Sequence, residues 1–199
     1  MRKIAVAAWL LVLLSTIAAL FWHNEWVYSL PTPVPNNYRT VNLGTVIDVT
    51  NKLPFKTDQP VLLHFYNPDC PCSRFNIPHF RSLVNTYGDK IRFVIVAVTR
   101  KKITASEILN KFNLNLPVLI DTALARECGV YSTPQAAIID TGKRLFYRGN
   151  YNRSRYCTDT RTEYVRMAID KLLHNNAAII FDEFALKAYG CQLPKQCTK

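Results

Sequence analysis

The sequence lacks the motifs of several common enzyme classes. It has only six glycines among 199 residues and no Gly-rich loop of the kind that cradles a phosphate. It has only four histidines, and it contains neither a Ser–His–Asp arrangement nor a Cys/His cluster at zinc-site spacing. Internal repeats and low-complexity tracts are also missing. These absences argue against a phosphate-loop enzyme, a triad hydrolase, a zinc domain and a repeat protein.

Charge is missing from one long N-terminal stretch. Residues 4–22 are uncharged, and at ~1.5 Å per residue they are long enough to span the ~30 Å hydrocarbon core of a bilayer. Arg2 and Lys3 precede this run and no Lys or Arg follows it before Arg39, which predicts a cytoplasmic N-terminus. A small-x-small cleavage site does not follow the run, so an uncleaved anchor is favoured over a signal peptide. Both interpretations export the rest of the chain.

The sequence predicts four regions. Residues 1–22 form the membrane anchor (or signal peptide), and residues 23–39 form a Pro- and Asn-rich linker. Residues 40–174 form the folded domain, and residues 175–199 form a tail. The formal net charge of +11 suits anionic headgroups or acidic partners, and nucleic acid is not expected outside the inner membrane.

The domain alternates strand-like and helix-like segments. Short apolar runs predict buried strands, and apolar residues at helical spacing predict the helices between them. Strands are expected at 60–66, 91–99 and 116–121, helices at 71–87, 104–112, 122–128 and 160–173, a hairpin at 135–149, and one further helix around 179–188. This order predicts an α/β fold with a central mixed sheet and helices on both faces.

Cys70-Pro71-Cys72 stands where a predicted strand turns into a predicted helix. The first N–H groups of a helix carry partial positive charge, which stabilises a thiolate. Arg74 adds to this effect, whereas Asp69 opposes it unless its carboxylate caps the helix. We therefore expect Cys70 to lose its proton more readily than an ordinary cysteine.

This layout resembles the thioredoxin-like superfamily, especially its exported, membrane-anchored redoxin (AhpC/TSA-like) branch. In that family a strand ends in Cys-x-x-Cys, and a proline follows the first cysteine by eight residues, as Pro78 follows Cys70 here. The alignment puts Cys70 at the nucleophile position and Ser73 at the second cysteine position, so that Cys-Pro-Cys replaces Cys-x-x-Cys. The resemblance covers residues 40–174 and implies a thioredoxin-like fold with thiol–disulfide exchange.

A second motif carries the same resemblance. The segment "CGVYSTPQAAIIDTGKRLFYRG" (128–149) is similar to the family's segment around its cis-proline. The match implies that Pro134 is that cis-proline and that the backbone of Thr133 faces the active cysteine. Thr133 and Pro134 are therefore the expected substrate-binding residues, because an exposed backbone edge there can pair with an extended substrate.

The partner of Cys70 is open at this point. Cys72 is the first candidate for the resolving cysteine and Cys157 the second. In a regular helix, positions i and i+2 point about 200° apart, so a Cys70–Cys72 bond needs Cys70 outside the first turn. The alternative is that Cys72 packs as a small apolar residue.

The remaining cysteines are expected to be structural. Cys128 is predicted to be a buried core thiol. A disulfide between Cys191 and Cys197 is the default in an oxidising compartment, and Cys157 to Cys191 is an alternative. The sequence does not choose among the connectivities.

These observations predict a periplasmic thiol–disulfide oxidoreductase that is anchored by a single pass in the inner membrane. It would act through Cys70 on exported protein thiols or disulfides, with a membrane electron donor or acceptor as a further partner and without a dissociable cofactor. The competing hypothesis is a non-catalytic Cu(I)-binding module that uses Cys70 and Cys72, since thiolates suit soft ions. His64 and His79 are expected to be packing or surface residues rather than ligands.

Overall fold

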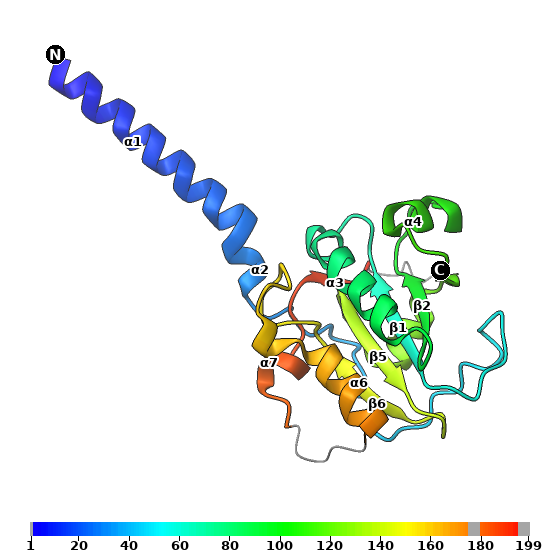
Figure 1. The fold of residues 1–199 in the computed structure, drawn as a ribbon. Coiled ribbons are helices and arrows are strands. Elements are labelled where there is room, and N and C mark those ends of the chain that lie inside the picture. The colour runs from blue at the N-terminus through cyan, green and yellow to red at the C-terminus, as the bar shows by residue number, and fades with distance from the viewer. Residues whose placement is uncertain (1, 175–179, 195–199) are drawn as a thin grey trace.

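The computed structural model describes residues 2–174 and 180–194 of the chain. A long N-terminal helix projects away from an α/β domain (Figure 1). It comprises α1 (Arg2–Phe21), the π-helical turn η1 (Trp22–Trp26) and α2 (Val27–Ser29). Within the described residues, Arg2–Ser29 is the one helix long and apolar enough to cross a membrane. The helix therefore runs past the expected anchor and into the segment expected as a linker.

The domain is built on a five-stranded sheet in the order β3-β2-β1-β5-β6. Its strands are β1 (Val61–Tyr66), β2 (Arg92–Ala97), β3 (Val118–Ile120), β5 (Gln135–Ile139) and β6 (Leu145–Gly149). The first three strands are parallel, and β5 and β6 form an antiparallel hairpin on the other side of β1. This mixed sheet, with helices on both faces, confirms the thioredoxin-like fold class.

Local signals set the ends of the helices. Helix α3 (Pro71–Tyr87) begins with a proline, which needs no N–H partner in the first turn, and is capped by Gly88. Helix α4 (Ala105–Phe112) begins with the expected capping box between Thr104 and Glu107. The other helices are α5 (Thr122–Glu127), the 3₁₀ helix η2 (Thr160–Thr162), α6 (Tyr164–His174) and α7 (Glu183–Leu186).

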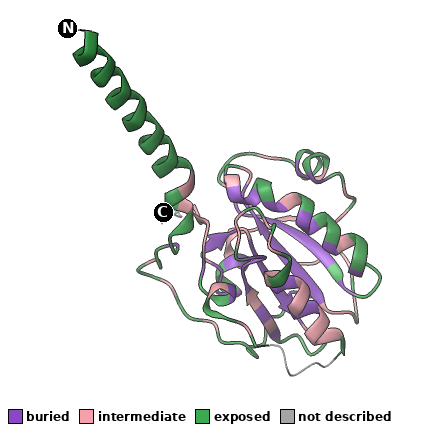
Figure 2. Cartoon of the chain, turned by 60° about the vertical axis from the view of Figure 1, so that its left-hand side comes forward, coloured by how far each residue is buried: buried purple, intermediate pink, exposed green. Residues whose placement is uncertain are grey.

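Two apolar clusters fill the two faces of the sheet. Because successive strand residues point to opposite faces, Leu62 and Tyr66 of β1 pack with α3, α4 and α6, whereas Leu63 and Phe65 pack with α5 and residues 47–49. Figure 2 shows the central strands buried and α1 exposed along its length. The sheet is therefore a rigid base for the loop that follows β1, where Cys70 stands.

A second, two-stranded sheet joins distant parts of the chain. Strand β4 (Ser132–Thr133) pairs antiparallel with β7 (Cys191–Gln192), which lies in the C-terminal tail. The tail therefore returns to the edge of the domain beside α3, which the sequence did not indicate.

Candidate redox site

Cys70 stands at the junction between the loop after β1 and helix α3. Its backbone is extended (φ −85°, ψ 119°), so it is the N-cap residue and lies outside the first helical turn. Its carbonyl oxygen accepts a hydrogen bond from the N–H of Arg74. Only 1% of the residue is exposed. The sulfur therefore lies at the positive end of the helix dipole in a nearly closed site.

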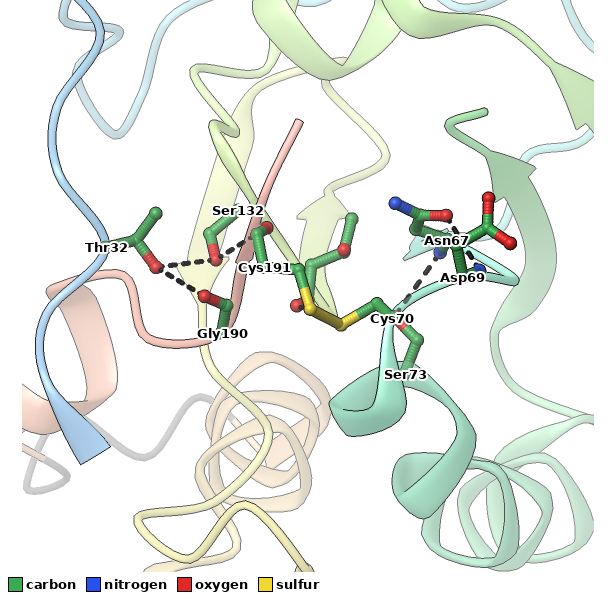
Figure 3. The surroundings of a disulfide bond; sticks show 9 residues. Thr32, Asn67, Asp69, Cys70, Ser73, Ser132, Gly190 and Cys191 are labelled. Carbon is green, nitrogen blue, oxygen red and sulfur yellow. Dashed lines mark hydrogen bonds between the residues drawn. A yellow bond between two sulfur atoms is a disulfide. The ribbon is translucent and has the colours of Figure 1, made fainter. Parts of the chain in front are cut away.

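Cys70 is joined to Cys191 by a disulfide across 121 residues of sequence (Figure 3). The sequence suggested that Cys191 pairs with Cys197 or with Cys157, and both suggestions are wrong for this form of the protein. The reason is the pairing of β7 with β4, which places Cys191 opposite Thr133 and within reach of Cys70. Cys197 lies outside the described residues.

Thr133 and Pro134 lie against this disulfide. The peptide bond between them is cis, and the carbonyl oxygen of Thr133 lies 3.3 Å from Cys70 Sγ. In the disulfide form this is a contact, because the sulfur carries no hydrogen; a reduced Cys70 thiol has an acceptor at the same place. The structure therefore brings Cys70, Thr133 and Pro134 together.

Cys72 is a third sulfur beside the disulfide. The Sγ atoms of Cys70, Cys72 and Cys191 all lie within 4.8 Å of one another. Cys72 is buried and free, and burial raises the pKa of its thiol. Cys72 is therefore near enough to exchange with the disulfide. Its raised pKa lowers the thiolate fraction at neutral pH, so Cys72 is a weak nucleophile in this form.

Cys157 and Cys128 are also free thiols. The side-chain amide of Asn76 donates to Cys157 Sγ over 3.1 Å, but burial is the larger effect and raises the pKa of this thiol to about 11. Cys128 lies in the core as expected, and burial raises its pKa to about 12. Neither residue is bonded to Cys70.

The side chains around Cys70 differ from expectation in one respect. Asp69 was expected as a possible helix cap, but its carboxylate accepts a hydrogen bond from Lys101 Nζ at 2.7 Å, and helix α3 has no side-chain cap. Ser73, which aligns with the second cysteine of Cys-x-x-Cys, is buried, and its hydroxyl accepts a hydrogen bond from the N–H of Asn67. The carboxylate charge of Asp69 is therefore directed away from the helix terminus.

The two buried histidines serve packing. His64 Nδ1 lies 2.7 Å from the hydroxyl of Tyr151, and the ring stacks on Phe80. Burial lowers the pKa of His64 to about 3. His79 lies 3.5 Å from a carboxylate oxygen of Glu163, and burial lowers its pKa. Both rings are therefore neutral at pH 7.

A cavity of about 520 Å³ opens between the end of the N-terminal helix and the loop after β6. Cys72 and Pro134 are among the residues that line it. Arg155 fixes the helix end beside it, because its guanidinium stacks over Tyr28 at 4.6 Å and lies 3.6 Å from Glu25. The site therefore lies next to the segment that leads to the predicted anchor.

Three residues of this site were not assigned to it from the sequence. Cys191 forms the disulfide, Gly190 precedes it, and Thr32 contacts Gly190 from the other side. Thr32 and Cys191 lie more than a hundred residues apart, and no local pattern connects them. The available local signal was a Gly-Cys dipeptide in a tail that follows a predicted helix, and such a dipeptide does not identify the partner of its cysteine.

Comparison with known proteins agrees with this fold. No curated protein matches the chain. An uncharacterized conserved protein from Geobacillus kaustophilus is similar in structure, with a TM-score of 0.64 and 20% identity over 85% of this chain and 100% of that chain. The hypothetical protein SMc02350 from Sinorhizobium meliloti 1021 gives a TM-score of 0.61 and 18% identity over 78% and 95%. These two likenesses show the fold.

A further solved structure overlaps less well. A thiol:disulfide interchange protein from Bacteroides sp. has a TM-score of 0.44 and 13% identity over 60% of this chain and 76% of that chain. The family model of a domain of unknown function, DUF6436, matches residues 44–193, a range that holds both Cys70 and Cys191. The chain belongs to the DUF6436 family.

Proposed function

We propose that this protein is a thiol–disulfide oxidoreductase whose redox pair is Cys70 and Cys191. The observation that carries the proposal is the disulfide between the N-cap cysteine of α3 and the tail, set against the backbone of Thr133. A cysteine at a helix N-terminus makes a stable thiolate and a good leaving group. Cys191 takes the resolving role, for which Cys72 was the first candidate from the sequence and Cys157 the second.

The exchange runs in two steps. The Cys70 thiolate attacks a partner disulfide, forms a mixed disulfide with one partner sulfur and releases the other as a thiolate. The Cys191 thiolate then attacks Cys70 Sγ, forms the Cys70–Cys191 disulfide and releases the first partner sulfur. The partner disulfide gains two electrons and the chain loses two. Run in reverse, the same steps oxidise a partner dithiol.

The proposed location is the periplasmic face of the inner membrane, with the N-terminal helix as a single-pass anchor. The basic residues Arg2 and Lys3 stand at the N-terminal end of the apolar helix, and the domain follows the helix. The proposed partners are exported protein thiols or disulfides, and a membrane electron donor or acceptor would restore the starting redox state.

Single-turnover reduction of a small peptide disulfide by the pre-reduced full-length protein in detergent, with the reductant removed, tests the proposal. Cys70→Ser should abolish turnover, and Cys191→Ser should slow it and accumulate a mixed disulfide on Cys70. Cys72→Ser and Cys157→Ser are matched controls that should keep turnover within about two-fold of the wild type. Accumulation of the mixed disulfide in the Cys72 or Cys157 variant instead would return the resolving role to that residue.

Cu(I) binding is the second candidate, and the cluster of three sulfurs favours it. When reduced, Cys70, Cys72 and Cys191 offer three soft donors within 4.8 Å of one another, one more than the pair expected from the sequence. The reduced protein should then retain about one equivalent of Cu(I) through desalting against a weak competitor. Cys72→Ser should weaken retention while leaving thiol–disulfide turnover intact. Lack of retention by the reduced wild type would dismiss this candidate.

A further inference from the structure

The tail residues around Cys191 lie in a slot with two walls. One wall is β4, and the other is the chain that leaves the N-terminal helix at residues 31–33. Figure 3 shows Gly190 and Cys191 between Thr32 and Cys70. The tail therefore bends at Gly190 and continues as the short strand β7, whose Cys191 reaches Cys70.

The β4 wall binds the tail through its backbone. Thr133 pairs with Cys191 and Ser132 pairs with Gln192 in antiparallel register. The pairing continues where the N–H of Leu193 donates to the carbonyl oxygen of Tyr131 at 3.2 Å. The hydroxyl of Ser132 also donates to the carbonyl oxygen of Cys191 at 3.2 Å. Backbone groups of the tail thus make most of these contacts, and any extended peptide carries the same groups.

The opposite wall contributes Thr32. Its N–H donates to the carbonyl oxygen of Ala188 at 2.8 Å, and its hydroxyl donates to the carbonyl oxygen of Gly190 at 3.1 Å. The hydroxyls of Thr32 and Ser132 also lie 2.9 Å apart, so the two walls contact each other, and one of the two hydroxyls donates to the other in place of its tail carbonyl when this bond forms. Thr32 is 5% exposed and Ser132 is fully buried. With the tail in place, these polar groups are paired with each other and with the tail backbone in a site closed to water.

Gly190 fits this slot for two reasons. Its φ of +129° lies in a region that residues with a Cβ rarely adopt. A Cβ at this position would also collide with the carbonyl oxygen of Thr133 and would lie 3.2 Å from Ser132 Oγ. A strand that follows the same backbone path as the tail therefore favours glycine directly before its cysteine.

We infer that this slot is the substrate site, that it selects extended polypeptides with glycine directly before the reactive cysteine, and that the tail occupies it as an internal substrate. The inference rests on the proposed function. With the chain reduced, a partner disulfide strand replaces the tail in the slot, the Cys70 thiolate attacks its cysteine sulfur, and the second partner sulfur leaves as a thiolate. The tail then returns, the Cys191 thiolate attacks Cys70 Sγ, and the first partner sulfur leaves as a thiolate while the Cys70–Cys191 disulfide closes.

Two activated peptides test the selection. The full-length Cys191→Ser variant in detergent is treated with Tyr-Gly-Cys-Gln or Tyr-Ala-Cys-Gln, each carrying thionitrobenzoate on its cysteine. Release of the coloured thiolate gives the coupling rate, and mass mapping locates the peptide on Cys70. The glycine peptide should couple at least about ten-fold faster than the alanine peptide, because the added Cβ meets Thr133. Equal rates would overturn the inference.

A variant of the tail tests whether the tail occupies the slot. Adding Gly190→Ala to the Cys191→Ser background should expel the tail and raise coupling of the glycine peptide by about five-fold or more. Gly142→Ala is the matched control, because Gly142 lies in the turn between β5 and β6 and its φ is ordinary. It should leave the rate unchanged. An unchanged rate in the Gly190 variant would show that the tail does not compete for the slot.

A small disulfide reagent distinguishes failure of the inference from failure of the proposed function. Reaction of Cys70 with 2-hydroxyethyl disulfide needs the proposed chemistry but not the slot. If Cys70 reacts with this reagent and the peptides do not differ, only the inference fails. If Cys70 reacts with neither the reagent nor the peptides, the proposed function fails and the inference fails with it.

Discussion

Loss of the Cys70–Cys191 disulfide should lower the stability of the domain by an amount that the length of the closed loop sets. The bond spans 121 residues of sequence. In the chain-entropy account, closing a loop of this length in the unfolded chain contributes about 5 kcal/mol at 25 °C. For a chain of this size, about 2–4 °C of Tm corresponds to each kcal/mol, so the expected loss is roughly 10–20 °C.

Thermal unfolding of the full-length protein in detergent, followed by circular dichroism with and without reductant, measures this loss. The Tm of the wild type should fall on reduction. The Cys191→Ser variant should already have the Tm of the reduced wild type, and reductant should not change it. Cys157→Ser is the control: Cys157 forms no disulfide, so this variant should respond to reductant as the wild type does. A wild type whose Tm does not change on reduction would refute the assignment of the bond.

Three further predictions concern protonation and location. After reduction, Cys157 should resist alkylation at pH 8, where a pKa of about 11 leaves ~0.1% thiolate, and mass mapping of time-resolved iodoacetamide labelling should show its rate rising about ten-fold per pH unit up to that pKa. His64 is neutral in the folded state to about pH 3 but binds a proton in the unfolded chain below about pH 6.5, so it should cost the fold about 2.5 kcal/mol between pH 6 and pH 4. His64→Gln should remove this part of the fall in unfolding free energy with pH, as measured by denaturant titrations at each pH. Wild type and variant curves of identical slope would contradict this prediction. A phosphatase that is active only in the periplasm should be active when fused after Lys199, and activity from a cytosolic reporter alone would contradict export.

The sequence was sufficient where the signal is local. Helix α3 begins at Pro71 and ends at Tyr87 as predicted, because a proline at the first helical position and a glycine after the last one act through their own backbone. The capping box at Thr104 is local in the same way. The parallel strands and the hairpin followed from apolar runs whose length and turn residues admit few other structures.

The Cys70–Cys191 disulfide could not be predicted because it depends on a non-local contact. Cys70 was identified from its place at a strand–helix junction, whereas Cys191 reaches it only through the pairing of β7 with β4. Two-residue strands such as these carry no alternation that a pattern could detect. The role of Asp69 was missed for a similar reason, since its partner Lys101 comes from the loop after the neighbouring strand β2.

Disulfide mapping of the full-length protein, with free thiols trapped by an alkylating reagent at the moment of cell lysis, tests directly whether Cys70 is bonded to Cys191. The digest should contain one cross-linked pair that joins the peptide with Cys70 to the peptide with Cys191, and Cys72 should carry the alkyl group. Cys72 shares a short stretch with Cys70, so a protease that cleaves between them, or fragmentation of the cross-linked pair, assigns the bond. A Cys70–Cys72 bond, or a Cys191–Cys197 bond with Cys70 alkylated, would contradict the account.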